Sequence, residues 1–324
     1  MKKKKILVTG ASGFIGYEVS RQLASANYRP RLMIRRPLND VSIRHFDAEF
    51  VKGNLRDPKS LERSVKGMDA VIHLGARATF ESYERLKPII LDGSLNLMRA
   101  AVEAGLKHFV YSSSLLVYGD QRREVDETTP AQPILDYGRI KLETETRLSE
   151  MASAANINFA AIRLPHVYGT MDLYFQQLRR GLLIQPGLGR NNFAHMHVKD
   201  TARMLIACAK QDYKGISPVG DKYPATWAEF TKTVRQYYPG ARVIILPCWL
   251  AIMAATMITP FRRFRPHPGL ETPGAVRSFN CNIPVKPEFI WKDLKLKLRF
   301  PTIYEGVPAV VDELKRMGSR SADL

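Results

Sequence analysis

Short runs of apolar, mostly β-branched residues recur along the first half of the chain, and helical stretches separate them. The runs cover residues 5–9, 30–34, 70–74, 108–112 and 159–163. The clearest segments with helical periodicity are residues 14–25, 94–104 and 138–154. This alternation is typical of βαβ units, in which helices cover both faces of a parallel sheet. We therefore predict an α/β fold with a doubly wound parallel sheet.

The regular order ends near residue 165. Pro186, Gly187 and Gly189 indicate a loop, and residues 198–210 form a strong helical segment with Asp200 near its start. We expect the chain to leave a first domain here and to return to it. The predicted division is a domain over residues 1–170, with a return at about 191–220, and a smaller domain, mainly for substrate binding, over residues 171–324.

The most apolar stretch of the chain runs from Ile244 to Phe261. Pro247 and Pro260 leave only twelve residues between them, whereas a membrane-spanning helix needs about 20. Two interpretations remain. The stretch is either a buried or lid helix of the second domain, or a membrane-surface helix anchored by the basic residues at 262–265.

Composition agrees with a soluble intracellular protein rather than a small secreted module. The chain has 324 residues, of which 45% are hydrophobic and 25% are charged. Cys208, Cys248 and Cys281 lie far apart, which indicates neither a disulfide framework nor a metal site. The basic start precedes only a short apolar run, so it does not resemble a signal peptide. We expect a cytoplasmic protein, in contact with a membrane if the second interpretation of residues 244–265 holds.

The chain is strongly basic, with 49 Lys and Arg against 31 Asp and Glu and a net charge of +18. Such a charge attracts nucleic acid, anionic lipid or a phosphorylated ligand. The basic residues are spread along the chain, and no aromatic RNA-binding pattern interleaves them. We therefore expect a small-molecule substrate and no nucleic-acid partner.

A glycine-rich turn follows the first predicted strand and opens the first predicted helix. It places Gly10, Gly13 and Gly16 in a G-x-x-G-x-x-G spacing. Glycines here allow a tight turn, close approach of a pyrophosphate to backbone N–H groups, and close packing of helix on strand. The pattern predicts a Rossmann-type site for a dinucleotide.

The end of the second strand indicates which dinucleotide is preferred. An NAD site usually carries an acidic residue there for the ribose 2′-hydroxyl, but this chain has Arg35 and Arg36. A guanidinium pairs with a 2′-phosphate and stacks on adenine. We therefore predict NADP in preference to NAD.

Tyr137 and Lys141 lie four residues apart at the start of a predicted helix, so their side chains share one face. A phenol with a pKa near ~10 is a weak base at neutral pH, but a nearby ammonium favours its phenolate. The pair is therefore suited to exchange a proton with a substrate oxygen. Three serines, at 112–114, end the strand that precedes it.

With these motifs in order, the chain resembles the extended short-chain dehydrogenase/reductase family. The resemblance rests on TGASGFIG at 9–16, GMDAVIHLGA at 67–76, SSSLLVYGD at 112–120, YGRIK at 137–141, IRLPHVYG at 162–169 and HVKD at 197–200. It covers roughly residues 5–235, and it implies an NAD(P)-dependent enzyme that often forms a homodimer.

The resemblance also implies roles for particular residues. Ser114 would hydrogen-bond the substrate oxygen, Tyr137 would be the acid/base, and Lys141 would lower the pKa of Tyr137 and hold the nicotinamide ribose. The implied cofactor-binding residues are Gly10, Ser12, Gly13, Phe14, Ile15, Gly16, Arg35, Asn54, Leu55, Leu74, Gly75, Ala76, Tyr137, Lys141 and Pro165. The implied substrate-binding residues are Ser114, His166 and Phe193.

Several positions depart from the family pattern. Asn54 stands where an Asp is frequent, and Ile90 stands where an Asn frequently links helices. His166 occupies the place of an Asn in sugar-nucleotide enzymes; such a histidine either faces the substrate or is simply packed. Phe193 aligns with an Arg that clamps the diphosphate of nucleotide sugars.

Phe193 in place of that Arg disfavours a nucleotide sugar. The segments GLGRNNFAHMHVKDTARMLIACA at 187–209 and ATWAEF at 225–230 resemble instead the branch of 3β-hydroxysteroid dehydrogenases, dihydroflavonol reductases and related ketone reductases. We therefore expect an oxidoreductase that interconverts a secondary alcohol and a ketone on a hydrophobic or small carbonyl substrate. Two alternatives remain open. The first is a nucleotide-sugar epimerase or dehydratase, and the second is a cofactor-binding scaffold without turnover, which the intact Ser114, Tyr137 and Lys141 disfavour.

Overall fold

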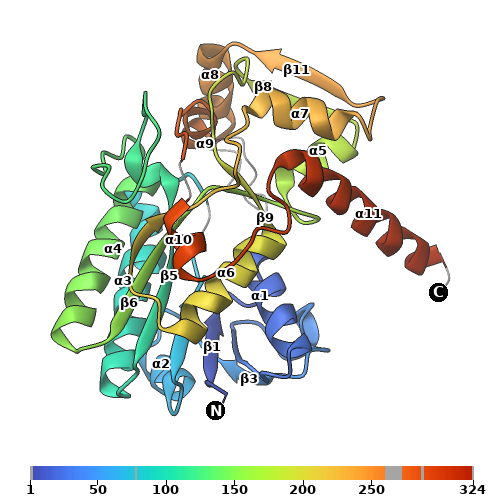
Figure 1. Cartoon of the computed structure of the whole chain (residues 1–324). Coiled ribbons are helices and arrows are strands. Elements are labelled where there is room, and N and C mark those ends of the chain that lie inside the picture. Colours follow the sequence, from blue (N-terminus) through green and yellow to red (C-terminus); the bar gives the residue numbers. More distant parts are fainter. Residues whose placement is uncertain (1–2, 77–78, 260–271, 286–287, 323–324) are drawn as a thin grey trace.

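A parallel sheet of seven strands forms the centre of the molecule (Figure 1). The computed structural model describes residues 3–76, 79–259, 272–285 and 288–322. The strands are β1 (Ile6–Thr9), β2 (Arg31–Ile34), β3 (Glu49–Lys52), β4 (Ala70–His73), β5 (His108–Ser114), β6 (Asn158–Leu164) and β10 (Gly215–Pro218). Their order is β10-β6-β5-β4-β1-β2-β3, and the strand order reverses between β1 and β4. This confirms the predicted doubly wound Rossmann fold.

Helices cover both faces of the sheet because alternate strand residues point to opposite sides. Ile6 and Val8 of β1 pack into one apolar cluster, whereas Leu7 packs into another. The first cluster is covered by α1 (Phe14–Ser25), α6 (Val198–Gln211) and α10 (Glu288–Asp293). The second is covered by α2 (Pro58–Val65), α3 (Tyr83–Glu103) and α4 (Asp136–Ala154). Residues near the C-terminus thus pack against the sheet of the N-terminal half.

The remaining elements form a smaller layer with its own buried cluster. They are α5 (Leu173–Arg179), β8 (Leu182–Pro186), α7 (Trp227–Arg235), β11 (Arg242–Leu246), α8 (Cys248–Ile258) and α9 (Pro273–Phe279), which we call the cap. Two short parallel ribbons occur, β8 with β11, and β7 (His166–Tyr168) with β9 (His195–His197). The 3-10 turns η1 (Leu38–Asp40) and η2 (Leu115–Tyr118) and the helix α11 (Ile303–Ala322) complete the elements. The cap lies at the end of the molecule opposite the N-terminus (Figure 1).

One predicted helix start was wrong. The segment predicted over 94–104 is the second half of α3, which begins at Tyr83 and contains Pro88. A proline removes one helical hydrogen bond and usually ends a helix, which hid the first turns from the periodicity. The segment predicted over 198–210 does begin at Val198, but His197 caps it and Asp200 lies in its first turn.

Asp200 has a different role. It is completely buried, pairs with Arg203 at 2.6 Å, and accepts hydrogen bonds from the backbone N–H groups of Arg299 and Phe300, each at 2.9 Å. It therefore ties α6 to a segment that lies a hundred residues later.

The apolar stretch predicted as one unit from Ile244 forms the end of β11 and then α8. Only Ala251 and Ala255 of α8 are buried, so the helix is not a buried one, and its role as a lid stays a prediction. Residues 262–265 lie outside the described part of the chain. Within that part, no helix is both long and apolar enough to cross a bilayer.

Candidate functional site

The glycine turn between β1 and α1 is closely packed, and its backbone requires the glycines. Gly10 has a φ of +66°, and a Cβ there would lie 2.7 Å from the backbone of Leu74. A Cβ on Gly16 would lie 2.0 Å from the carbonyl oxygen of Gly10. Gly13 donates its N–H to the Gly10 carbonyl at 2.9 Å and caps α1. This arrangement leaves the N-terminus of α1 free of bulky backbone substituents, as a bound pyrophosphate requires.

The other predicted cofactor residues lie at the carboxyl ends of neighbouring strands. Asn54 and Leu55 follow β3, residues 74–76 follow β4, and Pro165 follows β6. Arg35 directly follows β2; it is exposed, and it forms no ion pair within the part of the chain that the structure describes. Strands β2 and β3 are neighbours in the sheet, and β4 lies on the other side of β1. The structure thus collects these residues along one edge of the sheet, around the point where strand order reverses.

A buried hydrogen-bond network beneath this edge was missed from the sequence. His73 contacts the Oγ1 of Thr9 through Nδ1 at 2.6 Å and the Oγ of Ser94 through Nε2 at 2.9 Å. Thr9 also accepts the N–H of Gly75 at 3.1 Å. Burial lowers the pKa of His73 to about 3, so the imidazole is neutral. Ser94 lies one turn after Ile90, and the network links β1, β4 and α3 without the family's asparagine at position 90.

The predicted catalytic residues come from β5 and α4. Ser114 is the last residue of β5, and its Oγ accepts the N–H of Leu116 at 3.2 Å. Lys141 is 2% exposed and donates to the carbonyl oxygen of Ser112 at 2.7 Å. Its Nζ lies 4.7 Å from the ring centre of Tyr111 and 5.9 Å from that of Tyr137.

Burial governs the ionisation of this pair. It lowers the pKa of Lys141 to about 7, an effect that the carboxylate of Glu145 opposes. It raises the pKa of Tyr137 to about 12, so the lowering of this pKa that was expected from Lys141 is not observed. Tyr137 therefore keeps its proton at neutral pH, and the phenol is a proton donor.

A buried ion pair holds α4 against β6. Arg163 contacts Glu145 through two nitrogens, at 2.5 and 3.2 Å, and its guanidinium lies 4.8 Å from the ring centre of Tyr118. Both partners are almost fully buried. Because Glu145 is one turn after Lys141, the ion pair fixes the helical turn that carries the lysine.

His166 packs against aromatic side chains of the buried cluster in the cap. Its Nδ1 lies 2.9 Å from Nδ1 of His195, and its Nε2 lies 3.4 Å from a carboxylate oxygen of Asp172. Its ring also lies 4.6 Å from that of Trp227. Burial holds the pKa of His195 well below its usual range, so the close contact joins His166 to a neutral partner. These contacts support the packed alternative for His166.

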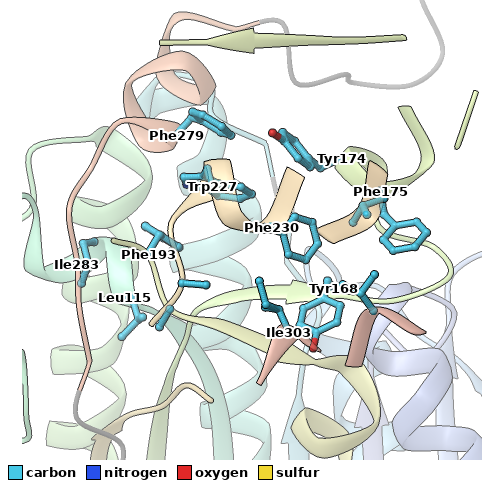
Figure 2. Close-up of a cluster of buried hydrophobic side chains, with 14 of the residues drawn as sticks. Leu115, Tyr168, Tyr174, Phe175, Phe193, Trp227, Phe230, Phe279, Ile283 and Ile303 are labelled. Carbon is cyan, nitrogen blue, oxygen red and sulfur yellow. The ribbon is translucent and has the colours of Figure 1, made fainter. Parts of the chain in front are cut away.

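Phe193 belongs to the same cluster (Figure 2). It is 7% exposed and stacks on Trp227, which in turn stacks on Phe279 with ring centres 4.4 Å apart. The position aligned with a diphosphate-binding arginine is therefore part of an aromatic stack. Its contact with a substrate stays a prediction, and no cluster of potential metal ligands occurs among the described residues.

Comparison with known proteins places this geometry in a family. A model of the NAD dependent epimerase/dehydratase family matches residues 6–219. The chain belongs to this family. It is thus an NAD(P)-dependent enzyme of the extended short-chain dehydrogenase/reductase type, as the motifs indicated.

The relatives act on different substrates. A ceramide reductase of Caulobacter vibrioides is 27% identical over 234 residues, which cover 70% of this chain and 68% of the relative. An N-acetyl-alpha-D-glucosaminyl-diphospho-ditrans,octacis-undecaprenol 4-epimerase of Escherichia coli O157:H7 is 27% identical over 196 residues, 57% of either chain. The solved structure of MoeE5 in complex with UDP-glucose and NAD has a TM-score of 0.78 at 21% identity, covering 97% of this chain and 99% of that one. At this identity the structural likeness shows the fold alone.

Proposed function

We propose that the chain exchanges a hydride between NAD(P) and a secondary alcohol or its ketone. The observation that carries this proposal is the placement of Lys141, which is buried one helical turn from Tyr137 with its ammonium held by the carbonyl of Ser112. Burying a lysine ammonium costs free energy unless the charge is paired, and such strongly perturbed groups cluster at functional sites. Here it lies where its charge acts on the Tyr137 phenol.

In the reduction direction, the protonated Tyr137 is the proton donor. The reduced cofactor NAD(P)H, when bound, would supply a hydride to the carbonyl carbon. Tyr137 donates its proton to the carbonyl oxygen, and Ser114 donates a hydrogen bond to the same oxygen. The charge of Lys141 stabilises the resulting phenolate, which regains a proton from solvent. Oxidation of the alcohol runs through the same groups in reverse.

The cofactor site comprises the glycine turn and the strand ends already described. Gly10 and Gly16 fit a dinucleotide because any side chain there would collide with backbone. Arg35 supports a preference for NADP, since its exposed guanidinium follows β2 without a competing ion pair in the described residues. The structural neighbours, by contrast, are NAD complexes.

For the substrate, an epimerase or dehydratase acting on a nucleotide sugar has at least as much support as a simple oxidoreductase. The family model and the neighbours that bind UDP-sugars favour it. In that case the ketone forms only transiently, and the cofactor is regenerated within one turnover.

An oxidoreductase acting on an apolar ketone is the second candidate, and one residue favours it. Phe193 stands in an aromatic stack where a diphosphate would need a cation. The ceramide reductase among the relatives also fits this candidate. Pairing of two copies through Rossmann helices, which the family resemblance implies, is compatible with either substrate.

One experiment separates the two candidates. The protein is incubated with NAD or NADP and a panel of UDP-sugars and sterols, and with NADH or NADPH and long-chain ketones. Both cofactor absorbance and product are recorded. Net change in reduced cofactor with an apolar substrate supports the oxidoreductase. An isomerised or dehydrated sugar without net change in cofactor supports the epimerase or dehydratase. Product formation that persists in Tyr137→Phe would contradict the proposed chemistry in both forms.

A further inference from the structure

The outer side of the cap carries large apolar side chains that nothing in the described structure covers. We define the apolar face as Leu182, Ile184, Ile244, Trp249, Met253 and Met257. Each of these residues has between 47% and 69% of its surface exposed. They come from adjacent elements: β8 pairs with β11, with Ile184 opposite Ile244, and α8 begins two residues after β11. Large exposed apolar patches mark sites of interaction.

Helix α8 is oriented in an unusual way. Its small residues Ala251 and Ala255 are buried and pack against Val276 of α9. Trp249, Met253 and Met257, spaced four apart, share the outward stripe with exposures of 69, 48 and 67%. An ordinary surface helix buries its large apolar residues and exposes polar ones. The orientation of α8 is the reverse, and no described residue covers its stripe, which makes the stripe a candidate site of interaction.

Charge indicates the partner. The sequence stretches at 173–199 and 230–270, which supply β8, β11 and α8, contain no Asp or Glu and have four and six Lys or Arg residues respectively. Among these, Arg180, Arg190 and Arg242 are exposed. A second copy seated on this face would bring two sets of arginines together without an acidic residue from either stretch. An anionic surface that also accepts apolar side chains matches both properties.

We propose that the apolar face docks onto the surface of an anionic lipid bilayer. Trp249 and the two methionines enter the boundary between headgroups and acyl chains, and the arginines contact the lipid phosphates. No helix spans the membrane in this arrangement, and α8 lies along its surface.

The docked face lies beside the predicted catalytic helix. A groove of 290 Å³ has an apolar wall formed by Ile252 of α8, Val276 of α9, and Ile134 and Leu135, and its other lining residues are Asp120, Cys248, Arg277, Asn280 and Cys281. Leu135 is the N-cap of α4 and lies two residues before Tyr137. On the basis of the proposed function, we infer that the substrate alcohol or ketone belongs to a membrane lipid whose alkyl chain occupies this groove.

Tryptophan fluorescence tests the docking without any substrate. Trp227 and Trp291 are buried, at 6% and 8% exposure, so Trp249 is the only one of the three tryptophans that lipid can reach directly. With vesicles of phosphatidylglycerol and brominated phosphatidylcholine, we expect quenching of the wild type. Trp249→Phe should still sediment with the vesicles but lose the quenching. Sedimentation of the wild type without quenching would overturn the proposed face.

Matched methionine variants test the affinity. The double variant Met253→Glu with Met257→Glu should bind vesicles at least about tenfold more weakly, because two apolar side chains no longer leave water. Met317→Glu, on α11 at 49% exposure, is the control and should bind as the wild type does. Circular dichroism and cofactor affinity report whether each variant is folded. Equal binding of the folded double variant would overturn the proposal.

Two further outcomes are decisive. Absence of binding to phosphatidylglycerol vesicles at low salt would refute docking. A concentration-dependent dimer that the double variant dissociates would identify a second copy as the true occupant. Tyr137→Phe should bind vesicles normally. If the wild type binds vesicles but is inactive on every substrate, the proposed function fails and the docking stands. If it is active on a soluble substrate but does not bind vesicles, the docking fails and the proposed function stands.

Discussion

Apolar runs in the sheet are buried, whereas apolar runs in the cap are largely exposed. Residues 6–9 of β1 and 70–73 of β4 are completely enclosed, with helices on both sides. The equally apolar residues 242–246 of β11 and 248–258 of α8 are covered on one side at most. A run of apolar residues therefore predicts that a helix or strand forms, but it does not predict whether that element is buried.

The largest expected effect is on catalysis, which the residues on the sheet side carry out. Tyr137→Phe keeps the ring and its packing on the sheet side but removes the proton donor, so turnover should fall by about 10² to 10⁴. Cofactor dissociation constants should stay nearly unchanged. Steady-state rates and a cofactor titration measure the two effects. Tyr304→Phe, an exposed tyrosine of α11, is the control, and a loss of less than about tenfold in Tyr137→Phe would contradict its role as acid/base.

Breaking a buried ion pair on the sheet side should lower stability more than breaking an ion pair on the exposed surface. Glu145→Gln leaves Arg163 buried without its charged partner and should lower the free energy of unfolding by about 3–5 kcal/mol. Asp92→Asn breaks the exposed pair with Lys87, whose partners are 46% and 44% exposed, and should cost less than about 1 kcal/mol. Urea denaturation measures both. Similar losses for the two variants would show that burial of the Arg163 pair has little effect.

The buried Lys141 gives the sheet side a specific dependence of stability on pH. Its pKa is about 7 in the folded protein and 10.5 in the ordinary range, so between these values the unfolded state binds more protons. The free energy of unfolding should therefore rise with pH over this window, and the gain is lost as pH falls through about 7. In Lys141→Met this rise should be absent. Denaturation curves of both proteins across the window test it, and identical pH profiles would exclude the lysine as their cause.

Replacing one glycine in each region by alanine compares a closely packed backbone with an open one. Gly16→Ala places a Cβ 2.0 Å from the Gly10 carbonyl and should cost about 1–3 kcal/mol of stability as well as cofactor affinity. Gly240→Ala, before β11, meets nothing within 4 Å and should change stability by no more than about 0.5 kcal/mol. Thermal denaturation with and without cofactor records both. A tolerated Gly16→Ala with normal cofactor binding would disprove the close approach at the turn.

The smallest expected effect concerns cofactor choice. Wild type should bind NADPH more tightly than NADH, and Arg35→Asp should remove about tenfold of that preference because a carboxylate repels the 2′-phosphate. Arg147→Asp, at an exposed position of α4, is the control for the change in net charge. Equal affinity of the wild type for both cofactors would refute the NADP preference.

The sheet half was largely predictable because strand and helix periodicities alternate regularly over most of it. The glycine turn and the helix at 14–25 could be located from spacing, whereas the Tyr137–Lys141 pair became a candidate only together with the surrounding family motifs. The first turns of α3 could not, since Pro88 interrupts them. The Thr9, His73 and Ser94 network was also missed, because hydrogen bonds between distant segments leave no periodic signal. In the cap, the contact between His166 and His195 depends on pairing of β7 with β9, which no local pattern specifies.

The tie between Asp200 and the backbone of Arg299 and Phe300 has a consequence for how the two parts of the molecule move. The chain passes from the sheet to the cap after β6, returns at α6, leaves again after β10, and returns at α10. A part attached by a single linker can rotate about it in any direction, whereas a part attached at several separated places can turn only about an axis that all the linkers share. We therefore expect relative motion to be small. Exchange of cofactor and substrate would then depend mainly on loops at the strand ends.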